Sequence, residues 1–452
     1  MDANRFATHS LQDPRLLRIL SAALKAVDPF EAVQKHLPNI NGRVYGLGIG
    51  KAAIPMMDAL AERIPLSGGL AITKFASGLS RKLYPVIEGG HPIPDARSLH
   101  AGERVLEFVS SLHEDDLLAC LISGGGSALV TAPYEGITLE DLQSLTSLLL
   151  ACGARIDEIN TLRRQLDRIK GGGLARATKA KIISLILSDV IGNPLETIAS
   201  GPTYPNPTTK EDAIAILRKY KIEDQIPSSI SRFLSLSLRD AERQGNLHVD
   251  EGIASGGFDT ADKRRLLNHP RNDDRVQNTI IGDNKLAAQA AMEQAQREGF
   301  HAEILTNELQ GEAREVGATM AKRLRDEITK RPRPFCLIAG GETTVTIRGT
   351  GKGGRNQELA LASVNELVGL KDVMLIALAT DGDDGPTDAA GAVVTGESAR
   401  RAERLGLSAA DHLSQDNAYP FFDALGDLIK TRPSGTNVND LIFLFTISAR
   451  PR

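Results

Sequence analysis

Short apolar runs of strand length recur along this chain, and each run ends in a glycine-rich or acidic loop that leads into a helix-like segment. The runs show no alternation of polar and apolar residues, which is typical of strands buried on both faces of a parallel sheet. The spacing between runs fits helical crossovers. The pattern therefore predicts an α/β fold with helices on both faces of mostly parallel sheets. The five clearest runs with their loops lie at 43–53, 116–129, 181–194, 334–345 and 373–392.

The length of the chain indicates two domains, because 452 residues exceed what one ordinary core organises. The stretch from about 236 to 275 is polar and rich in glycine and charged residues, which is typical of a linker or a surface insertion. We expect an N-terminal domain over residues 1–240, a polar linker or insertion over 241–275, and a C-terminal domain over 276–452.

Charge and composition argue against several classes of partner. The net charge of −4 gives no electrostatic footprint for nucleic acid or a membrane surface. No apolar run approaches 18 residues, and the first residues do not read as a secretory signal. The three cysteines show no metal-type spacing and fit a reducing compartment. We expect a cytoplasmic protein without nucleic-acid or membrane partners, and the sequence leaves its oligomeric state open.

The first glycine-rich loop, "GLGIGKAA", is a candidate anion site. Gly48 and Gly50 permit a tight turn, and Lys51 opens the next helix, where backbone N–H groups and the lysine charge favour an anion. The spacing fits neither the P-loop nor the dinucleotide-binding pattern. A plain strand–helix turn with a solvated lysine is the alternative.

A second loop, "SGGGS", runs through Ser123, Gly124, Gly125, Gly126 and Ser127. Its glycines let the backbone approach a phosphate or carboxylate closely, and its serines add hydroxyl donors. The spacing is not that of a serine hydrolase, which needs G-x-S-x-G. The alternative is a loop that only permits tight packing.

Two further segments carry charged residues of types that take part in catalysis and anion binding. Asp189 ends a strand, where a carboxylate can accept a substrate proton or hold Mg²⁺, although helix capping is the alternative. Gly354, at the start of an expected helix, is a candidate for binding substrate or nucleotide. The guanidinium of Arg355, which follows it, can chelate phosphate or carboxylate bidentately.

The segment "TDGDDGPTDAAGA" supplies hard oxygen ligands of the kind that Mg²⁺ prefers, with Asp381, Asp384 and Asp388 as the candidates. A turn cluster of aspartates and glycines is the alternative. Among the nine histidines no zinc-binding spacing occurs, and His91 in "EGGHPIPD" is the one that we single out, although a core or capping histidine is the commoner case. Taken together, cations, glycine loops and acidic strand ends on one side of parallel sheets predict a phosphoryl transferase that acts on a small anion.

The chain resembles the class II glycerate kinases of the MOFRL family, some of which are labelled hydroxypyruvate reductases. The resemblance rests on segments that occur in order between about residues 46 and 441: "GIGKAA", "EGGHPIPDARS", "LISGGGSALV", "RIKGGGLA", "SDVIGNPLETIASGPT", "GGETTVTIRGTGKGGRNQELAL", "ATDGDDGPTDAAGA" and "SGTNVNDL". It implies a Rossmann-like N-terminal domain, a MOFRL C-terminal domain and an active site in the cleft between them. It also implies ATP-dependent phosphorylation of D-glycerate at its 2-hydroxyl, with Mg²⁺.

The resemblance also implies roles for individual residues. Lys51, Asp189 and Arg355 match the family's proposed catalytic residues: Lys51 and Arg355 would clamp the transferred phosphate, and Asp189 would assist the attacking hydroxyl. The loop at 123–127 would bind substrate or nucleotide phosphate, with Asn284 and Asn439 nearby. The chain departs from the family pattern at Asp383, where the family loop has an apolar residue, so the role of Asp383 is open.

Two other functions remain in competition. A nicotinamide-dependent hydroxypyruvate reductase needs a dinucleotide fingerprint and an acidic ribose partner, whereas "GLGIG" lacks that spacing and Lys74 or Lys82 dominates the region that follows. A non-catalytic sensor of a sugar acid or nucleotide would use the same anion-binding loops without turnover.

Overall fold

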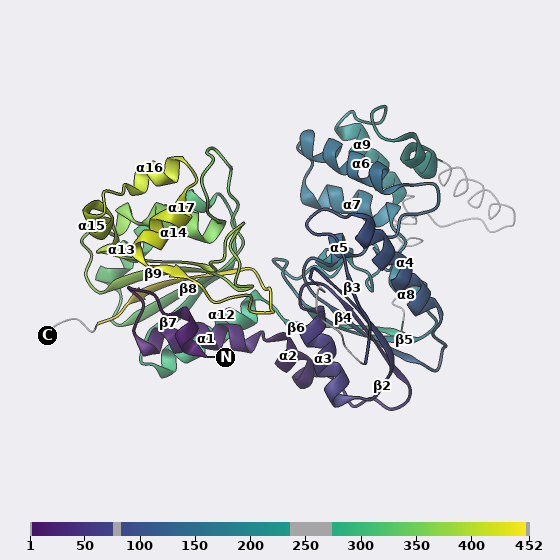
Figure 1. Cartoon of the computed structure of the whole chain (residues 1–452), viewed down its shortest axis with the longest axis horizontal. Coiled ribbons are helices and arrows are strands. Elements are labelled where there is room, and N and C mark those ends of the chain that lie inside the picture. Colours follow the sequence, from purple (N-terminus) through teal and green to yellow (C-terminus); the bar gives the residue numbers. More distant parts are fainter. Residues whose placement is uncertain (1, 76–82, 236–273, 449–452) are drawn as a thin grey trace, which may run out of the picture. The chain divides into compact units, whose positions relative to one another are not determined.

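The computed structural model describes residues 2–75, 83–235 and 274–448, and it contains two six-stranded sheets flanked by helices (Figure 1). The chain divides into two compact units, which we name by their sheets. The parallel-sheet unit comprises residues 37–186 and 194–279, and the mixed-sheet unit comprises residues 1–36, 187–193 and 280–452. Residues 241–273 of the expected linker lie outside the described residues, so the predicted domain boundaries stay a prediction.

The first sheet has the strand order β3-β2-β1-β4-β5-β6, and the strand pairs from β3 to β5 are parallel. This order is that of the Rossmann fold, in which the chain reverses direction across the sheet between its first and fourth strands. Ligands of such sheets bind beyond the carboxyl ends of the strands at that reversal. The loops after β1 and β4 therefore occupy the expected ligand position. The strands are β1 (Val44–Ile49), β2 (Leu66–Thr73), β3 (Val86–Glu88), β4 (Leu117–Ile122), β5 (Lys181–Leu187) and β6 (Val276–Gly282).

Helices of this unit begin where the sequence supplies capping residues. Asp95, Thr138 and Thr209 each accept backbone N–H bonds in capping boxes, which satisfies donors at the first turn. Three of these helices, α6, α7 and α9, pack their leucines and isoleucines into one apolar cluster. The helices are α3 (Ala53–Arg63), α4 (Ala96–Ser110), α5 (Gly126–Leu129), α6 (Leu139–Ala151), α7 (Ile156–Leu166), α8 (Gly173–Arg176), α9 (Lys210–Lys219) and the 3₁₀ helix η2 (Ile198–Ser200).

The second sheet has the order β11-β10-β9-β12-β8-β7 and is largely antiparallel. Only β7 and β8 pair in parallel, so the expectation of mostly parallel strands is wrong for this sheet. The reason is that β8, β9 and β12 are buried along their whole length, and a continuous apolar run does not reveal strand direction. The strands are β7 (His301–Leu309), β8 (Phe335–Gly341), β9 (Val373–Ala379), β10 (Gly391–Thr395), β11 (Leu428–Ile429) and β12 (Asp440–Thr446).

Helices cover this second sheet, and the N-terminal helix α1 packs against α12, far away in the sequence (Figure 1). None of the helices in the described part of the chain is long and apolar enough to cross a membrane. The α/β class is thus confirmed. The helices are α1 (Pro14–Ala26), α2 (Pro29–His36), α12 (Asn284–Arg297), α13 (Ala313–Lys330), α14 (Arg355–Ser363), α15 (Ser398–Arg404), α16 (Ala409–Ser414) and α17 (Ala418–Leu425), with 3₁₀ helices η1 (Ala3–Phe6) and η3 (Asn365–Leu367).

Candidate active site

The turns that follow β1 and β4 lie side by side, because these two strands are neighbours in the sheet. The backbone N–H of Lys51 donates to the carbonyl of Gly124 at 2.9 Å, and the N–H of Ala52 donates to the Ser123 hydroxyl at 3.0 Å. Gly50 has φ +126°, and a Cβ there would lie 2.2 Å from Ser123 Oγ. Only glycine fits this close approach, so the two turns form one structure.

Gly48 has a different task, since a Cβ there would lie 2.7 Å from Met57 Cγ, on helix α3. This glycine lets α3 pack closely on β1. Of the two glycines predicted to bind a ligand in this turn, Gly48 contacts the helix, whereas Gly50 contacts Ser123. Of this run, it is thus Gly50 and Lys51 that contact the β4 turn, and anion binding there stays a prediction.

His91 joins this cluster. A Cβ on Gly125 would lie 3.2 Å from the His91 ring and 3.3 Å from Lys51 Cγ, so the three residues are neighbours. Burial, together with the charges of Lys51 and Lys74, lowers the pKa of His91 to about 4. The imidazole is therefore neutral at neutral pH, and its buried Nδ1 has no hydrogen-bond partner among the described residues. A neutral ring beside two lysines leaves the cluster positive and suited to an anion.

A third loop reaches the same glycine turn. The hydroxyls of Ser127 and Ser200 lie 2.7 Å apart, and a Cβ on Gly126 would lie 2.8 Å from Ala199 Cβ. Ala199 and Ser200 have φ values of +49° and +60°, which non-glycine residues rarely adopt. Such backbone strain persists only where the surroundings fix it, and it concentrates at functional sites. Ser200 is a site residue that the sequence does not reveal, because its approach to Ser127 is a tertiary contact.

In the mixed-sheet unit, Arg355 begins α14 and is held by two carboxylates. Its Nε and Nη2 donate to Asp440 at 2.6 and 3.1 Å, and its Nη1 donates to Glu342 at 2.6 Å. These bonds use three of the five N–H donors of the guanidinium, which leaves donor capacity for an anionic ligand. Burial raises the pKa of the Asp440 carboxyl, while the Arg355 charge opposes that shift. The pairing fixes Arg355 in place.

Asp384 caps the helix that Arg355 begins. Its carboxylate accepts the backbone N–H groups of Asn356 at 3.0 Å and Gln357 at 2.8 Å, and the residue is 2% exposed. Burial raises the pKa of Asp384 to about 7 against the opposing effect of these two N–H bonds. A Cβ on Gly354 would lie 2.3 Å from Asp384 Cγ, so Gly354 is required for the carboxylate to reach the helix.

The other two predicted metal ligands make different contacts. Asp381 accepts the backbone N–H of Asp383 at 3.1 Å, while the 66% exposed Asp388 accepts the Tyr419 hydroxyl at 2.6 Å and lies 3.6 Å from Lys430 Nζ. Within residues 2–75, 83–235 and 274–448, no three His, Cys, Asp or Glu side chains gather as a metal site. The structure does not bring Asp381, Asp384 and Asp388 together as a ligand set.

Asp189, Asn284 and Asn439 are grouped around the segment that precedes β12. Asn437 donates to Asp189 at 3.4 Å, and the Asn284 amide donates to the carbonyls of Val438 and Asp440 at 2.9 Å each. Asn439 is buried with φ +66°. Asn284 and Asn439 line a polar cavity of about 380 Å³, together with Ser188, residues 190–193 and residues Thr306–Glu308 of β7. The predicted residues thus form two groups, one in each unit.

The first group is a cationic glycine turn at the reversal point of a Rossmann-type sheet. The second comprises an arginine held by carboxylates and a polar cavity lined by asparagines. These features define a two-unit α/β protein with positively charged groups suited to small anions. Residues 335–440 match the MOFRL family, and residues 15–235 match a domain of unknown function, DUF4147.

Alignments with named proteins cover nearly the whole chain. The chain is 40% identical to the glycerate 2-kinase of Pyrococcus horikoshii, over 96% of this chain and 98% of the relative. It is 38% identical to a putative hydroxypyruvate reductase of Agrobacterium vitis, over 94% of this chain and 92% of the relative. The crystal structure of glycerate kinase from Thermotoga maritima aligns with a TM-score of 0.82 and 38% identity, covering 95% of this chain and 98% of that one. The chain belongs to the glycerate 2-kinase family.

Proposed function

We propose that this chain transfers the γ-phosphoryl group of ATP to the 2-hydroxyl of D-glycerate, giving 2-phosphoglycerate and ADP. The observation that carries the proposal is the fused turn of Gly50, Lys51 and Ser123–Gly125 at the carboxyl ends of β1 and β4. Backbone N–H groups and a lysine at that position bind phosphate or carboxylate. Membership of the glycerate 2-kinase family supports this choice of donor and acceptor.

Phosphoryl transfer depends mainly on positioning and on stabilising charge. In this proposal Lys51 binds the transferred phosphoryl group, and the glycine turn binds phosphate or the glycerate carboxylate. Arg355, held by Asp440 and Glu342, uses its remaining N–H donors on an anionic oxygen. Asp189 accepts the proton of the 2-hydroxyl as that oxygen bonds to the γ-phosphorus and the bond to the bridging oxygen breaks.

Magnesium fits this site as a companion of the nucleotide. Mg²⁺ usually keeps several waters and is held by one or two carboxylates plus substrate phosphates, where it neutralises developing charge. Of the three predicted ligands, we retain Asp381, which follows β9 at its carboxyl end. Asp384 is occupied with the N–H groups of α14, and Asp388 with Tyr419 and Lys430. We further propose a cytoplasmic location, where ATP is available.

The test is turnover of the purified chain with D-glycerate, ATP and Mg²⁺, with 2- and 3-phosphoglycerate separated by ³¹P NMR. Absence of glycerate-dependent ADP would refute the proposal, and oxidation of NADH or NADPH by hydroxypyruvate would instead establish the reductase. Lys51→Ala should lower kcat by at least about a hundredfold, the scale of losing one preorganised electrostatic contact. The exposed Lys179→Ala serves as its matched control. A sensor would show no turnover in either variant or in the parent chain.

A further inference from the structure

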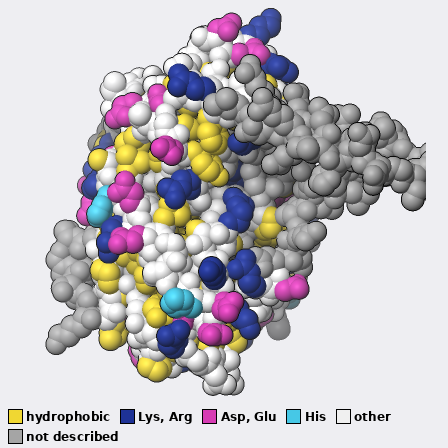
Figure 2. All heavy atoms as spheres, turned by 90° about the vertical axis from the view of Figure 1, so that its right-hand side faces the viewer, with side chains coloured by type: hydrophobic (Ala, Val, Ile, Leu, Met, Phe, Trp, Pro, Cys, Tyr) yellow, Lys and Arg dark blue, Asp and Glu magenta, His cyan; other side chains and the backbone are white. Residues whose placement is uncertain are grey.

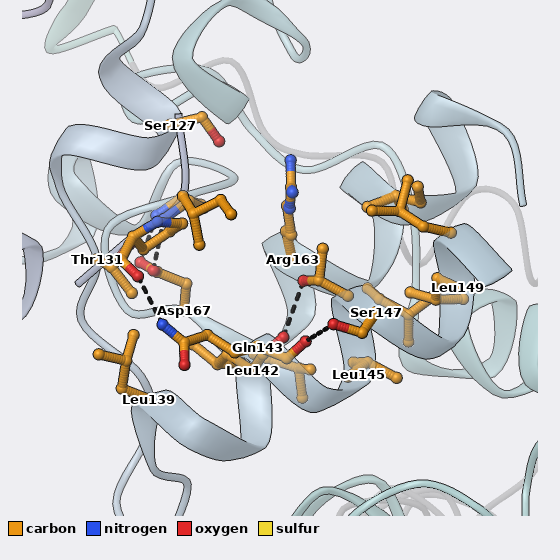
Figure 3. Close-up of a pocket in the computed structure, with 18 of the residues that line it drawn as sticks. Ser127, Thr131, Leu139, Leu142, Gln143, Leu145, Ser147, Leu149, Arg163 and Asp167 are labelled. Carbon is orange, nitrogen blue, oxygen red and sulfur yellow. Dashed lines mark hydrogen bonds and ion pairs between the residues drawn. The ribbon is translucent and has the colours of Figure 1, made fainter. Parts of the chain in front are cut away.

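An apolar cavity of about 250 Å³ lies in the parallel-sheet unit between α6 and α7 (Figure 3). Ser127, at the end of the glycine turn, is part of its wall, so the cavity borders the proposed phosphoryl-transfer site. Its volume is close to the lower end of the range for small-molecule pockets, roughly 300 Å³. Its wall is mostly aliphatic, which favours a ligand with an apolar body. The main wall residues are Leu142, Leu145, Leu149, Ile159, Leu162 and Leu166.

One cation on this wall has no anionic partner. Arg163 of α7 makes a single long contact, 3.4 Å from Nη1 to Asn160 Oδ1, and no carboxylate of the described chain lies within ion-pair distance of it. Burial lowers the pKa of the guanidinium. An uncompensated cation in apolar surroundings costs free energy, which a bound anion would recover.

The remaining charges on the wall cancel. Lys170 donates to Asp167 at 2.6 Å, and both side chains are almost fully buried, so this pair is neutral as a whole. The charged residues that line the cavity are Arg163, Asp167 and Lys170. The net charge facing the cavity is therefore one positive charge, which matches a monoanion.

A second polar group faces the cavity without a partner. Thr131 is 2% exposed, lines the cavity, and its Oγ1 has no hydrogen-bond partner among the described residues. A buried hydroxyl without a partner costs free energy, so it too favours a ligand that offers a hydrogen bond. Figure 3 shows Thr131 and Arg163 on the rim of the same space.

We propose that this cavity, which borders the phosphoryl-transfer site at Ser127, binds a ligand of its own, a small monocarboxylate with an aliphatic body. The guanidinium fork of Arg163 matches a carboxylate bidentately. Phosphate esters carry about two charges at neutral pH, which one arginine does not balance in an apolar wall. Glycerate has no aliphatic body to cover these leucines and isoleucines.

The test uses the full chain and octanoate, with binding measured by isothermal titration calorimetry. Octanoate should bind, while octylamine and 1-octanol, which lack the carboxylate, should bind at least about tenfold more weakly, the worth of a charge-assisted hydrogen bond. Equal binding of all three would reflect adsorption to exposed hydrophobic side chains, such as those on the face in Figure 2, and would overturn the proposal.

Variants locate the site. Arg163→Gln should weaken octanoate binding by about tenfold or more, whereas Arg104→Gln, a surface arginine of the same unit paired with Glu107, should leave it unchanged. Thr131→Val keeps the volume and removes the unpartnered hydroxyl, so it should fold well and weaken octanoate a few-fold. Unchanged affinity in both Arg163→Gln and Thr131→Val refutes the site. Displacement of octanoate by ATP or D-glycerate would place the cavity in the catalytic site and would also refute a ligand of its own.

Discussion

Gly50→Ala tests the conclusion that the β1 and β4 turns form one structure. A methyl group at this position would lie 2.2 Å from Ser123 Oγ and 2.4 Å from the Ser123 carbonyl oxygen, and φ is +126°. The backbone conformation costs an L-residue about 1–3 kcal/mol, and overpacking adds about 1–3 kcal/mol. We therefore expect the free energy of unfolding to fall by about 2–6 kcal/mol.

The matched control is Gly136→Ala, because Gly136 has φ +84° and nothing within 4 Å of its Cβ position. It should show only the backbone cost of about 1–3 kcal/mol. Urea unfolding followed by circular dichroism suits a chain without tryptophan. The double variant Gly50→Ala/Ser123→Ala should recover only part of the loss, since the carbonyl clash remains. If Gly50→Ala costs no more than Gly136→Ala, the reasoning about the fused turns is wrong.

Three further predictions concern charged groups. Asp384→Ala should lower the free energy of unfolding by about 2–4 kcal/mol, because two buried N–H groups of α14 lose their acceptor. Denaturation with and without Mg²⁺ checks it, and an effect seen only with Mg²⁺ would identify a metal ligand instead. Arg355→Lys should lower the free energy of unfolding by about 1–3 kcal/mol, since lysine does not make the bidentate bond to the buried Asp440. The urea midpoint and kcat measure the effect, and unchanged values of both would contradict the role proposed for Arg355. His91 has a folded pKa of about 4 against an ordinary value of 6.5, so the unfolded state binds its proton first and stability falls as the pH drops from about 6.5 to 4. His91→Gln should flatten that dependence, and an imidazole titration by NMR near pH 6.5 would disprove the shift.

The parts of this molecule that the sequence predicted are those with local causes. Apolar runs that end at Gly50, Ser123 and Asp189 depend on burial and turn chemistry within a few residues, so the α/β class and the glycine-rich turns after β1 and β4 follow from them. Strand direction in the second sheet is not local. It depends on β12 inserting between β8 and β9, which an apolar pattern does not record.

The acidic loop shows the same limit at the level of single residues. Asp381, Asp384 and Asp388 look equivalent as hard ligands in the sequence, yet their surroundings differ completely in the fold. Asp384 is buried against the N–H groups of a helix that begins 29 residues earlier, while Asp388 is exposed beside Tyr419. The alternative for this loop is a turn cluster of aspartates and glycines, whereas in the fold Asp384 caps α14. Only the tertiary position of α14 decides between a cap and a metal ligand.

The predicted site residue Asn284 holds the segment that leads into β12. Asn284 does not need to contact a ligand to matter, because its amide fixes the carbonyls of Val438 and Asp440, and the Asp440 carboxylate in turn holds Arg355. The fit is close: a Cβ on Gly340 would lie 1.7 Å from Asn284 Oδ1. Two hydrogen bonds from the Asn284 amide to carbonyls at the start of β12 leave this side chain little freedom to move. We therefore interpret Asn284 as a positioning residue that acts on the proposed chemistry through Asp440 and Arg355.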